Sequence, residues 1–92
     1  MFKEENRNNS LVLLIDEDKN LRFIISNYLK ENNINCVEAD NGLDGYKLIH
    51  ELKPDLILLE LDIAGMTGYD IMKKLKKEKM GNIPVYLITN QR

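Results

Sequence analysis

Short apolar runs that alternate with amphipathic segments are the feature that most constrains how this 92-residue chain folds. Leu11–Ile15 and Leu56–Leu59 contain apolar residues only, while Asn35–Ala39 and Pro84–Thr89 read as a second and a fourth strand. Short runs without polar alternation indicate strands that are buried on both faces of a parallel sheet. The chain is therefore expected to carry four parallel strands.

Between these runs, apolar residues recur at the spacing of a helix with one buried stripe. Lys53-Pro54 is expected to close the second helix, because the residue before a proline disfavours the helical region, and Thr67 with Asp70 resembles a capping box that opens the third. Strands alternating with helices predict right-handed crossovers and an α/β fold with a doubly wound parallel sheet. The three predicted stripes are Leu21, Ile24, Ile25, Tyr28 and Leu29; Leu48, Ile49 and Leu52; and Ile71, Met72 and Leu75.

Composition narrows the class of protein. The net charge of −2 provides no electrostatic reason for direct binding of nucleic acid, and no apolar run approaches the length of a membrane span. Residues 1–10 are polar and are expected to be a disordered lead, with one domain over residues 11–92. The single cysteine, Cys36, fits a reducing compartment, so a cytoplasmic protein is expected.

Polar residues follow the first and third predicted strands and end the fourth. Asp16 and Glu17 come directly after the first strand, Glu60 after the third, and Thr89 ends the fourth. The carboxyl ends of parallel strands share one edge of a sheet, where ligands bind in such folds. Carboxylates gathered there repel each other unless a cation or a proton intervenes, and Mg²⁺ prefers such oxygen ligands. The alternative is that these acids are solvated caps of the following helix.

Three segments carry a resemblance to a known family. Pro54–Gly68, the run Leu-Leu-Ile-Asp-Glu-Asp at residues 13–18 with Leu21-Arg22 after it, and Ile-Pro-Val-x-x-x-Thr at residues 83–89 together resemble a response-regulator receiver domain. The resemblance implies a flavodoxin-like fold with strand order 2-1-3-4. It also implies that the third strand should end on a phosphate-accepting aspartate. That position is Glu60 here, and Ala64 and Thr67 replace the proline and the second acid of the usual loop.

The resemblance also assigns roles to the other polar residues. Asp16 and Glu17 match the acidic pair that holds Mg²⁺ together with the acceptor residue, here Glu60. Asp62 matches the position that supplies a backbone carbonyl to the metal, and Thr89 matches the switch hydroxyl that follows the phosphoryl group. The cofactor implied is Mg²⁺, and the partner implied is a histidine kinase or a phosphotransfer protein.

The exchange of aspartate for glutamate at position 60 changes the expected function. One extra methylene moves the carboxylate outward by up to roughly 1.5 Å, about one C–C bond, and in-line phosphoryl transfer depends on such positioning. We therefore predict a degenerate receiver of a two-component phosphorelay, which acts by protein binding rather than by ordinary phosphorylation and which imitates the phosphorylated state weakly. The alternative is that Glu60 is an inert acid at a strand end.

The resemblance ends near Asn90, before the last strand, the last helices and the lysine that receivers usually carry. A receiver without these elements is expected to leave its fourth strand as an apolar edge, through which two copies could pair as a homodimer.

Two further functions stay open at this point. The chain is also consistent with the N-terminal fragment of a longer DNA-binding response regulator. The triplet Asp16-Glu17-Asp18 matches a haloacid-dehalogenase-like phosphatase less well, because Lys19-Asn20 lacks the small hydroxyl residue that should follow, and we expect no enzyme. His50, Cys36 and the five lysines between Lys73 and Lys79 are predicted to be surface, packing and solvated residues respectively.

Overall fold

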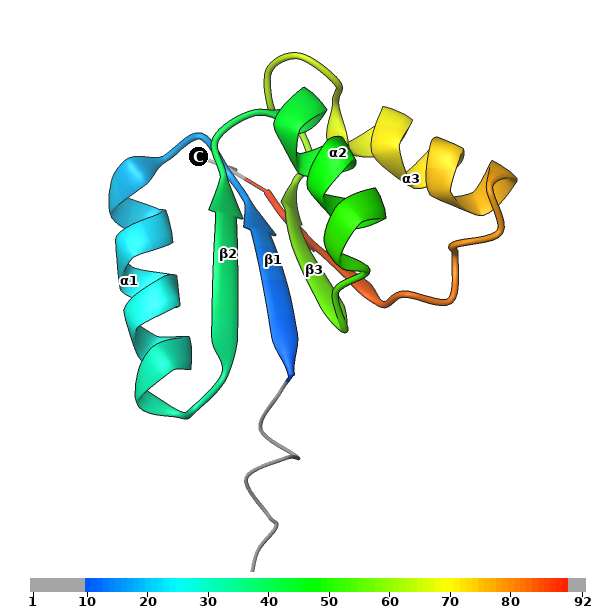
Figure 1. The fold of residues 1–92 in the computed structure, drawn as a ribbon. Coiled ribbons are helices and arrows are strands. Elements are labelled where there is room, and N and C mark those ends of the chain that lie inside the picture. The colour runs from blue at the N-terminus through cyan, green and yellow to red at the C-terminus, as the bar shows by residue number, and fades with distance from the viewer. Residues whose placement is uncertain (1–9, 90–92) are drawn as a thin grey trace, which may run out of the picture.

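Four parallel strands form the centre of the structure, a computed structural model that describes residues 10–89 (Figure 1). They lie in the order β2 (Asn35–Ala39), β1 (Leu11–Ile15), β3 (Leu56–Glu60) and β4 (Val85–Ile88). All three neighbouring pairs are parallel, which confirms the predicted doubly wound sheet. The predicted disordered lead lies outside the described residues except for Ser10, whose carbonyl accepts a hydrogen bond from the Asn35 N–H at 3.1 Å.

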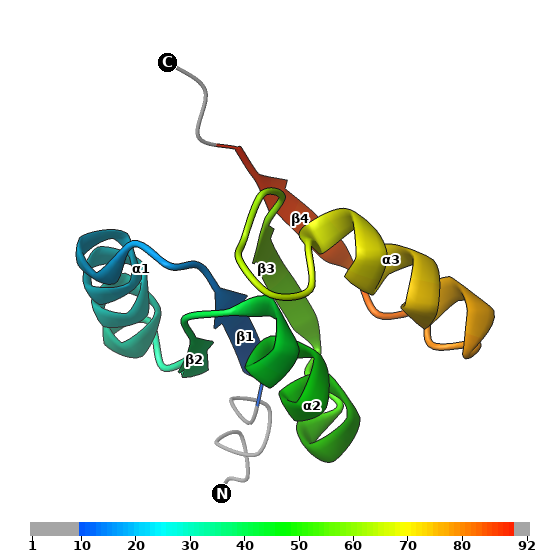
Figure 2. The same cartoon turned by 90° about the horizontal axis from the view of Figure 1, so that it is seen from above.

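Helices cover the two faces of the sheet unequally. α2 (Gly42–Leu52) and α3 (Gly68–Lys77) lie on one face, whereas α1 (Lys19–Glu31) lies alone on the other, beside β2 (Figures 1 and 2). None of the helices within residues 10–89 is long and apolar enough to cross a membrane.

Local signals set the ends of these helices. The Thr67 hydroxyl accepts a hydrogen bond from the Asp70 N–H at 3.1 Å, so Thr67 is the predicted N-cap of α3. Asn41 caps α2 in the same way, through the Asp44 N–H at 2.8 Å. Lys53 adopts the left-handed conformation with φ of 47° and ends α2 directly before Pro54, as predicted.

The main core lies between the sheet and the pair α2 and α3. Successive side chains along a strand point to opposite faces, so every second residue of a strand enters this core. Parallel pairing of β1 with β3 sets Leu13 beside Ile57 and Ile15 beside Leu59. The buried cluster consists of Leu13, Ile15, Ala39, Ile49, Ile57, Leu59, Ile63, Ile71 and Leu75.

The predicted apolar stripe of α1 is only partly buried, so this prediction is wrong for two of its residues. Leu21, Ile25 and Leu29 are half-buried, but Ile24 and Tyr28 are 64% and 65% exposed. The reason is that α1 packs mainly on β2, and no described helix lies over β3 or β4 on that face (Figure 2). In the other two predicted stripes, Leu52 and Met72 are also exposed, because they lie at the margins of the core.

The loop between β3 and α3 is held against the start of α2. The Gly42 N–H donates a hydrogen bond to the Ala64 carbonyl at 2.9 Å. A Cβ atom at position 42 would lie 1.7 Å from the Met66 carbonyl oxygen, so only glycine permits this approach. Gly65, with φ of 87°, makes the turn that brings the loop there. The loop that follows the candidate site is therefore positioned by two glycines.

Replacing Gly42 by alanine should destabilise the fold by about 1–3 kcal/mol, the usual cost of overpacking, although alanine is the better helix former. The measurement is urea unfolding followed by circular dichroism. Gly81→Ala is the matched control, because the nearest atom to an added Cβ there is the Lys76 Cα at 3.8 Å. Equal stability of the two variants would show that the loop moves away from α2 without cost.

Candidate functional site

The pairing of β1 with β3 brings two carboxylates together at the carboxyl edge of the sheet. Ile15 lies beside Leu59, so the residues that follow them, Asp16 and Glu60, meet where the strands end. Their exposed fractions are only 3% and 5%. A cavity of about 40 Å³ lies against them, lined by Asp16, Asp18, Leu21, Glu60, Ile88 and Thr89. The structure therefore brings together Asp16, Glu60 and Thr89 from three different strand ends, as predicted.

The turn from β1 into α1 is built from aspartate side chains. Asp16 Oδ1 accepts a hydrogen bond from the Asp18 N–H at 2.8 Å. Asp18 Oδ1 in turn accepts from the N–H groups of Asn20 and Leu21 at 3.0 and 3.2 Å, and so caps α1. Asp18 is thus the N-cap of α1, whereas Asp16, for which a helix cap was the alternative, is a buried acid of the site.

The Glu60 side chain is engaged within the pocket. Its Oε1 accepts a hydrogen bond from the Glu17 N–H at 3.0 Å, which ties the end of β3 to the turn after β1. Burial raises the pKa of the Glu60 carboxyl, the bond from Glu17 lowers that pKa, and the neighbouring charge of Asp16 raises it again; the net direction is upward. Glu60 is therefore a buried acid whose charge is unfavourable in the folded protein.

Two of the predicted ligands lie at the surface. The Glu17 side chain is exposed while its backbone N–H donates to Glu60, and Asp62, predicted to offer its backbone carbonyl, is exposed in the loop after β3. Within residues 10–89, no group of three or more His, Cys, Asp or Glu side chains is placed to hold a metal ion. What remains is a pair of carboxylates, Asp16 and Glu60, which is the donor set that Mg²⁺ often takes from a protein while it keeps several waters.

Sequence reasoning missed residues that shape the site from outside. Arg22 Nη1 donates to the Asp16 carbonyl at 2.7 Å, and Arg22 Nε pairs with Glu38 Oε1 at 3.0 Å. Arg22 thereby links the turn after β1 to β2. Gly42 sets the position of the loop between β3 and α3. No periodic pattern marks either role, because both depend on contacts between distant segments.

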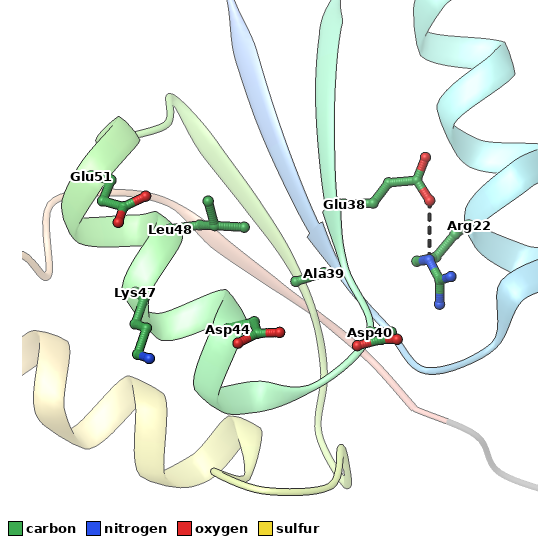
Figure 3. A pocket seen from close by; sticks show the side chains of 8 residues that line it. All are labelled: Arg22, Glu38, Ala39, Asp40, Asp44, Lys47, Leu48 and Glu51. Carbon is green, nitrogen blue, oxygen red and sulfur yellow. Dashed lines mark hydrogen bonds and ion pairs between the residues drawn. The ribbon is translucent and has the colours of Figure 1, made fainter.

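A larger open pocket of about 480 Å³ lies nearby, between the start of α1, the end of β2 and α2 (Figure 3). The Arg22–Glu38 ion pair stands at one side of it, and Asp44, Lys47 and Glu51 of α2 stand at the other (Figure 3). Its charged groups are of both signs, and all except Arg22 are exposed, so they define no particular ligand.

The remaining residues singled out in the sequence have structural roles. His50 Nε2 lies 3.0 Å from Glu78 Oε1, and the Tyr46 hydroxyl also donates to Glu78, which joins α2 to the end of α3. Burial raises the pKa of the half-buried Cys36 thiol to about 11, so Cys36 is a poor nucleophile. The five lysines from Lys73 to Lys79 are all exposed, as predicted.

Comparison with known proteins agrees with the geometry. The sequence pattern of the family described as "Response regulator receiver domain" matches residues 12–92, and the chain belongs to this family. Receiver domains are the signalling modules of two-component systems. The resemblance noted from the strand ends is thereby confirmed for the fold and the family.

Several curated proteins are similar to this chain. The response regulator protein VraR of Staphylococcus saprophyticus is 38% identical over 81 residues, which is 86% of this chain and 38% of that protein. The nitrate/nitrite response regulator protein NarL of Escherichia coli K12 is 36% identical over 88 residues, 92% of this chain and 41% of that protein. Sporulation initiation phosphotransferase F of Bacillus subtilis is 29% identical, and the chain spans 55% of its length. The chain is thus much shorter than these relatives.

Solved receiver domains share the fold. The receiver domain of the Francisella response regulator 1452 superposes with a TM-score of 0.83 at 28% identity, over 88% of this chain and 66% of that one. The Vibrio cholerae chemotaxis protein CheY4 has a TM-score of 0.81 at 19% identity, over 91% of this chain and 71% of that one.

The raised pKa of Glu60 predicts a pH-dependent effect of Glu60→Gln. The unfolded chain ionises near the ordinary value of 4.5, whereas the folded chain holds the proton to higher pH. Ionised Glu60 therefore costs stability above its folded pKa. Glu60→Gln should be more stable than the native chain at neutral pH, and this advantage should fade as the pH falls through the folded pKa towards 4.5.

Urea unfolding at several pH values, with a chelator present, measures this difference. Glu51→Gln, which removes an equal charge from an exposed position on α2, serves as the control. A Glu60→Gln variant that is less stable at every pH would show that the bond to the Glu17 N–H outweighs the cost of burial.

Proposed function

We propose that this chain is a degenerate receiver, which takes part in two-component signalling by binding other proteins and is not phosphorylated in the ordinary way. The observation that carries the proposal is the burial and hydrogen bonding of the Glu60 side chain. Its carboxylate is buried and accepts the Glu17 N–H at 3.0 Å, next to a cavity of only about 40 Å³. At about 10–15 Å³ for each water, that cavity has room for roughly three.

The geometry supports a poor phosphate acceptor for two reasons. A carboxylate that is one methylene longer lies where an incoming phosphoryl group would have to be placed, and misplacement by about 1 Å can cost on the order of 10²-fold in rate. In addition, the hydrogen bond from the Glu17 N–H makes Oε1 a weaker nucleophile. The same permanent carboxylate would imitate phosphorylation only weakly, because a phosphoryl group carries more charge and more acceptor oxygens.

A Mg²⁺ ion is compatible with the residues present. Asp16 and Glu60 would supply the two protein carboxylates, and waters would complete the coordination. The ion would offset the repulsion between these two buried acids and neutralise an approaching anion. The exposed Glu17 carboxylate and the Asp62 backbone carbonyl both stay predicted ligands. Thr89 lines the cavity and stays the predicted switch hydroxyl.

The proposed partner is a histidine kinase or a phosphotransfer protein. The chain would bind this partner in competition with a regulator that can be phosphorylated. Relatives of this chain include proteins named "Histidine kinase P4" and "Sensor histidine kinase CheAY". We propose no catalytic turnover and no direct contact with nucleic acid. Pairing of two copies through β4 and a cytoplasmic location both stay predictions.

A second candidate is the receiver part of a longer transcriptional regulator. The relatives NarL and PhoB are named as regulators, and the chain spans 41% and 34% of their lengths. This alternative predicts that the gene encodes a DNA-binding domain in the same reading frame. Sequencing the transcript beyond the codon for Arg92 tests it directly.

Intact mass spectrometry after incubation with acetyl phosphate and Mg²⁺ tests the leading proposal. We expect no added phosphoryl group on the native chain and one on Glu60→Asp, because the shorter acid restores the ordinary acceptor and empties the space beside Glu17. The control is Glu60→Asp combined with Asp62→Asn, which should still be modified.

A phosphoryl group on the native chain would overturn the proposal, and Asp62→Asn in the native background would then show which acid accepts it. If neither the native chain nor Glu60→Asp is modified, Glu60 is not the sole obstacle. The pocket is then incompetent for a further reason.

A further inference from the structure

The peptide unit between Asp16 and Glu17 makes hydrogen bonds in two opposite directions. It is planar and trans, so its carbonyl and its N–H point away from each other. On one side, the Glu17 N–H donates to Glu60 Oε1 at 3.0 Å. On the other side, the Asp16 carbonyl accepts from Arg22 Nη1 at 2.7 Å. One rigid peptide therefore stands between the Arg22 guanidinium and the Glu60 carboxylate.

The Arg22 side chain is itself fixed by a second contact. Its Nε pairs with Glu38 Oε1 at 3.0 Å, which joins α1 to β2 (Figure 3). The side chain is only 15% exposed. A guanidinium is planar and presents its N–H groups in fixed directions, so the bond to Glu38 also sets the direction of the bond to the Asp16 carbonyl.

The contact of Arg22 with the peptide differs from a surface ion pair. An exposed ion pair contributes little to stability, because water and salt screen it. The bond to the Asp16 carbonyl is charge-assisted, and Asp16 is only 3% exposed. The Asp16 N–H is also tied to β2, through the Ala39 carbonyl at 3.0 Å. Arg22 thus continues the attachment of the turn to β2 beyond the last paired residues, Ile15 and Ala39.

Two effects carry the influence of Arg22 to Glu60. The first is orientation, because a peptide plane that is held at its carbonyl cannot turn its N–H away from Glu60. The second is polarisation, because a hydrogen bond to a carbonyl strengthens the next bond in the series, by roughly 10–30%. Neither effect requires Arg22 to touch Glu60.

We propose that Arg22 is a positioning residue of the acidic site, which acts on the Glu60 carboxylate through the peptide unit between Asp16 and Glu17. Glu38 holds Arg22 in place, and its side chain is 38% exposed, so the series of contacts runs from the surface at β2 to the buried acids. Loss of Arg22 frees the peptide and weakens the bond that holds Glu60.

The same loss should weaken the binding of a Mg²⁺ ion by Asp16 and Glu60. This consequence rests on the proposed function, in which these two carboxylates are the ligands. Groups that orient metal ligands without touching the metal typically change its affinity by about 10–100-fold. The effect on the Glu17–Glu60 bond concerns the chain without metal and is tested separately.

Amide hydrogen exchange, measured residue by residue by NMR on the 92-residue chain with a chelator present, tests the effect on this bond. Arg22→Met removes the donors and keeps an apolar stem, and Glu38→Ala keeps the arginine but removes its anchor. Lys30→Met is the matched control, because it removes an equal charge from the last turn of the same helix. The Asn20 N–H, which donates to Asp18 Oδ1 at 3.0 Å, is the internal reference.

We expect Arg22→Met to speed exchange of the Glu17 amide at least about tenfold relative to the Asn20 amide, because a lost charge-assisted bond exceeds the free energy of a tenfold change. Glu38→Ala should act in the same direction by a smaller amount, and Lys30→Met should stay within about threefold of the native chain. The Glu17 amide proton should also move upfield in Arg22→Met, since its hydrogen bond weakens. Calorimetric titration with Mg²⁺ should show about tenfold weaker binding by Arg22→Met.

Equal acceleration of the Glu17 and Asn20 amides would overturn the proposal, because it would assign Arg22 to the docking of α1 as a whole. An unchanged Glu17 amide in Arg22→Met would also overturn it. Should Arg22→Met fail to fold, the same two results in Glu38→Ala decide the question.

The metal titration separates this inference from the proposed function. A native chain that binds no Mg²⁺ contradicts the proposed metal site, while the exchange of the Glu17 amide still decides the role of Arg22. If the native chain binds Mg²⁺ and Arg22→Met binds it equally well, the extension of the inference to the metal is wrong.

Discussion

The parallel pairing of β1 with β3 is the constraint on which the rest of the structure depends. These strands are the two central ones, and their inward residues Leu13, Ile15, Ile57 and Leu59 are fully buried. A slip of one residue would turn each of these side chains to the opposite face. The same register sets Ile15 beside Leu59 and thereby leaves Asp16 and Glu60 together at the strand ends. The core and the site are fixed by one pairing.

This placement has an electrostatic cost that the surrounding backbone partly offsets. Two carboxylates beside each other at 3% and 5% exposure repel, and burial penalises their charge further. Two backbone N–H groups of the turn after β1 donate hydrogen bonds to these carboxylates. The Asp18 N–H donates to Asp16, and the Glu17 N–H donates to Glu60. A site with this arrangement suits a cation. The long side chain of Glu60 reaches the Glu17 backbone.

The unequal coverage of the sheet links the fold to its surfaces. α2 and α3 together bury one face, and the Tyr46–Glu78–His50 contacts join these helices at their ends. On the other face, α1 lies beside β2 and leaves Ile24 and Tyr28 exposed. Tyr86 of β4 lies on the same face as α1 and is also exposed, while Val85 packs against the core on the other face.

The sequence by itself determined the elements, their order and the edge of the sheet at which the polar residues gather. Apolar runs and helical spacing are local signals, and caps such as Thr67 and stops such as Lys53-Pro54 act within a few residues. The position of Glu60 at the end of β3 followed from the same signals. Only the tertiary structure decided the rest. Which acids point inward, the contact between Gly42 and Met66, the role of Arg22 and the exposure of Ile24 and Tyr28 all depend on segments far apart in the chain. Spacing along the sequence records which side chains share a face of an element, but not whether another element covers that face.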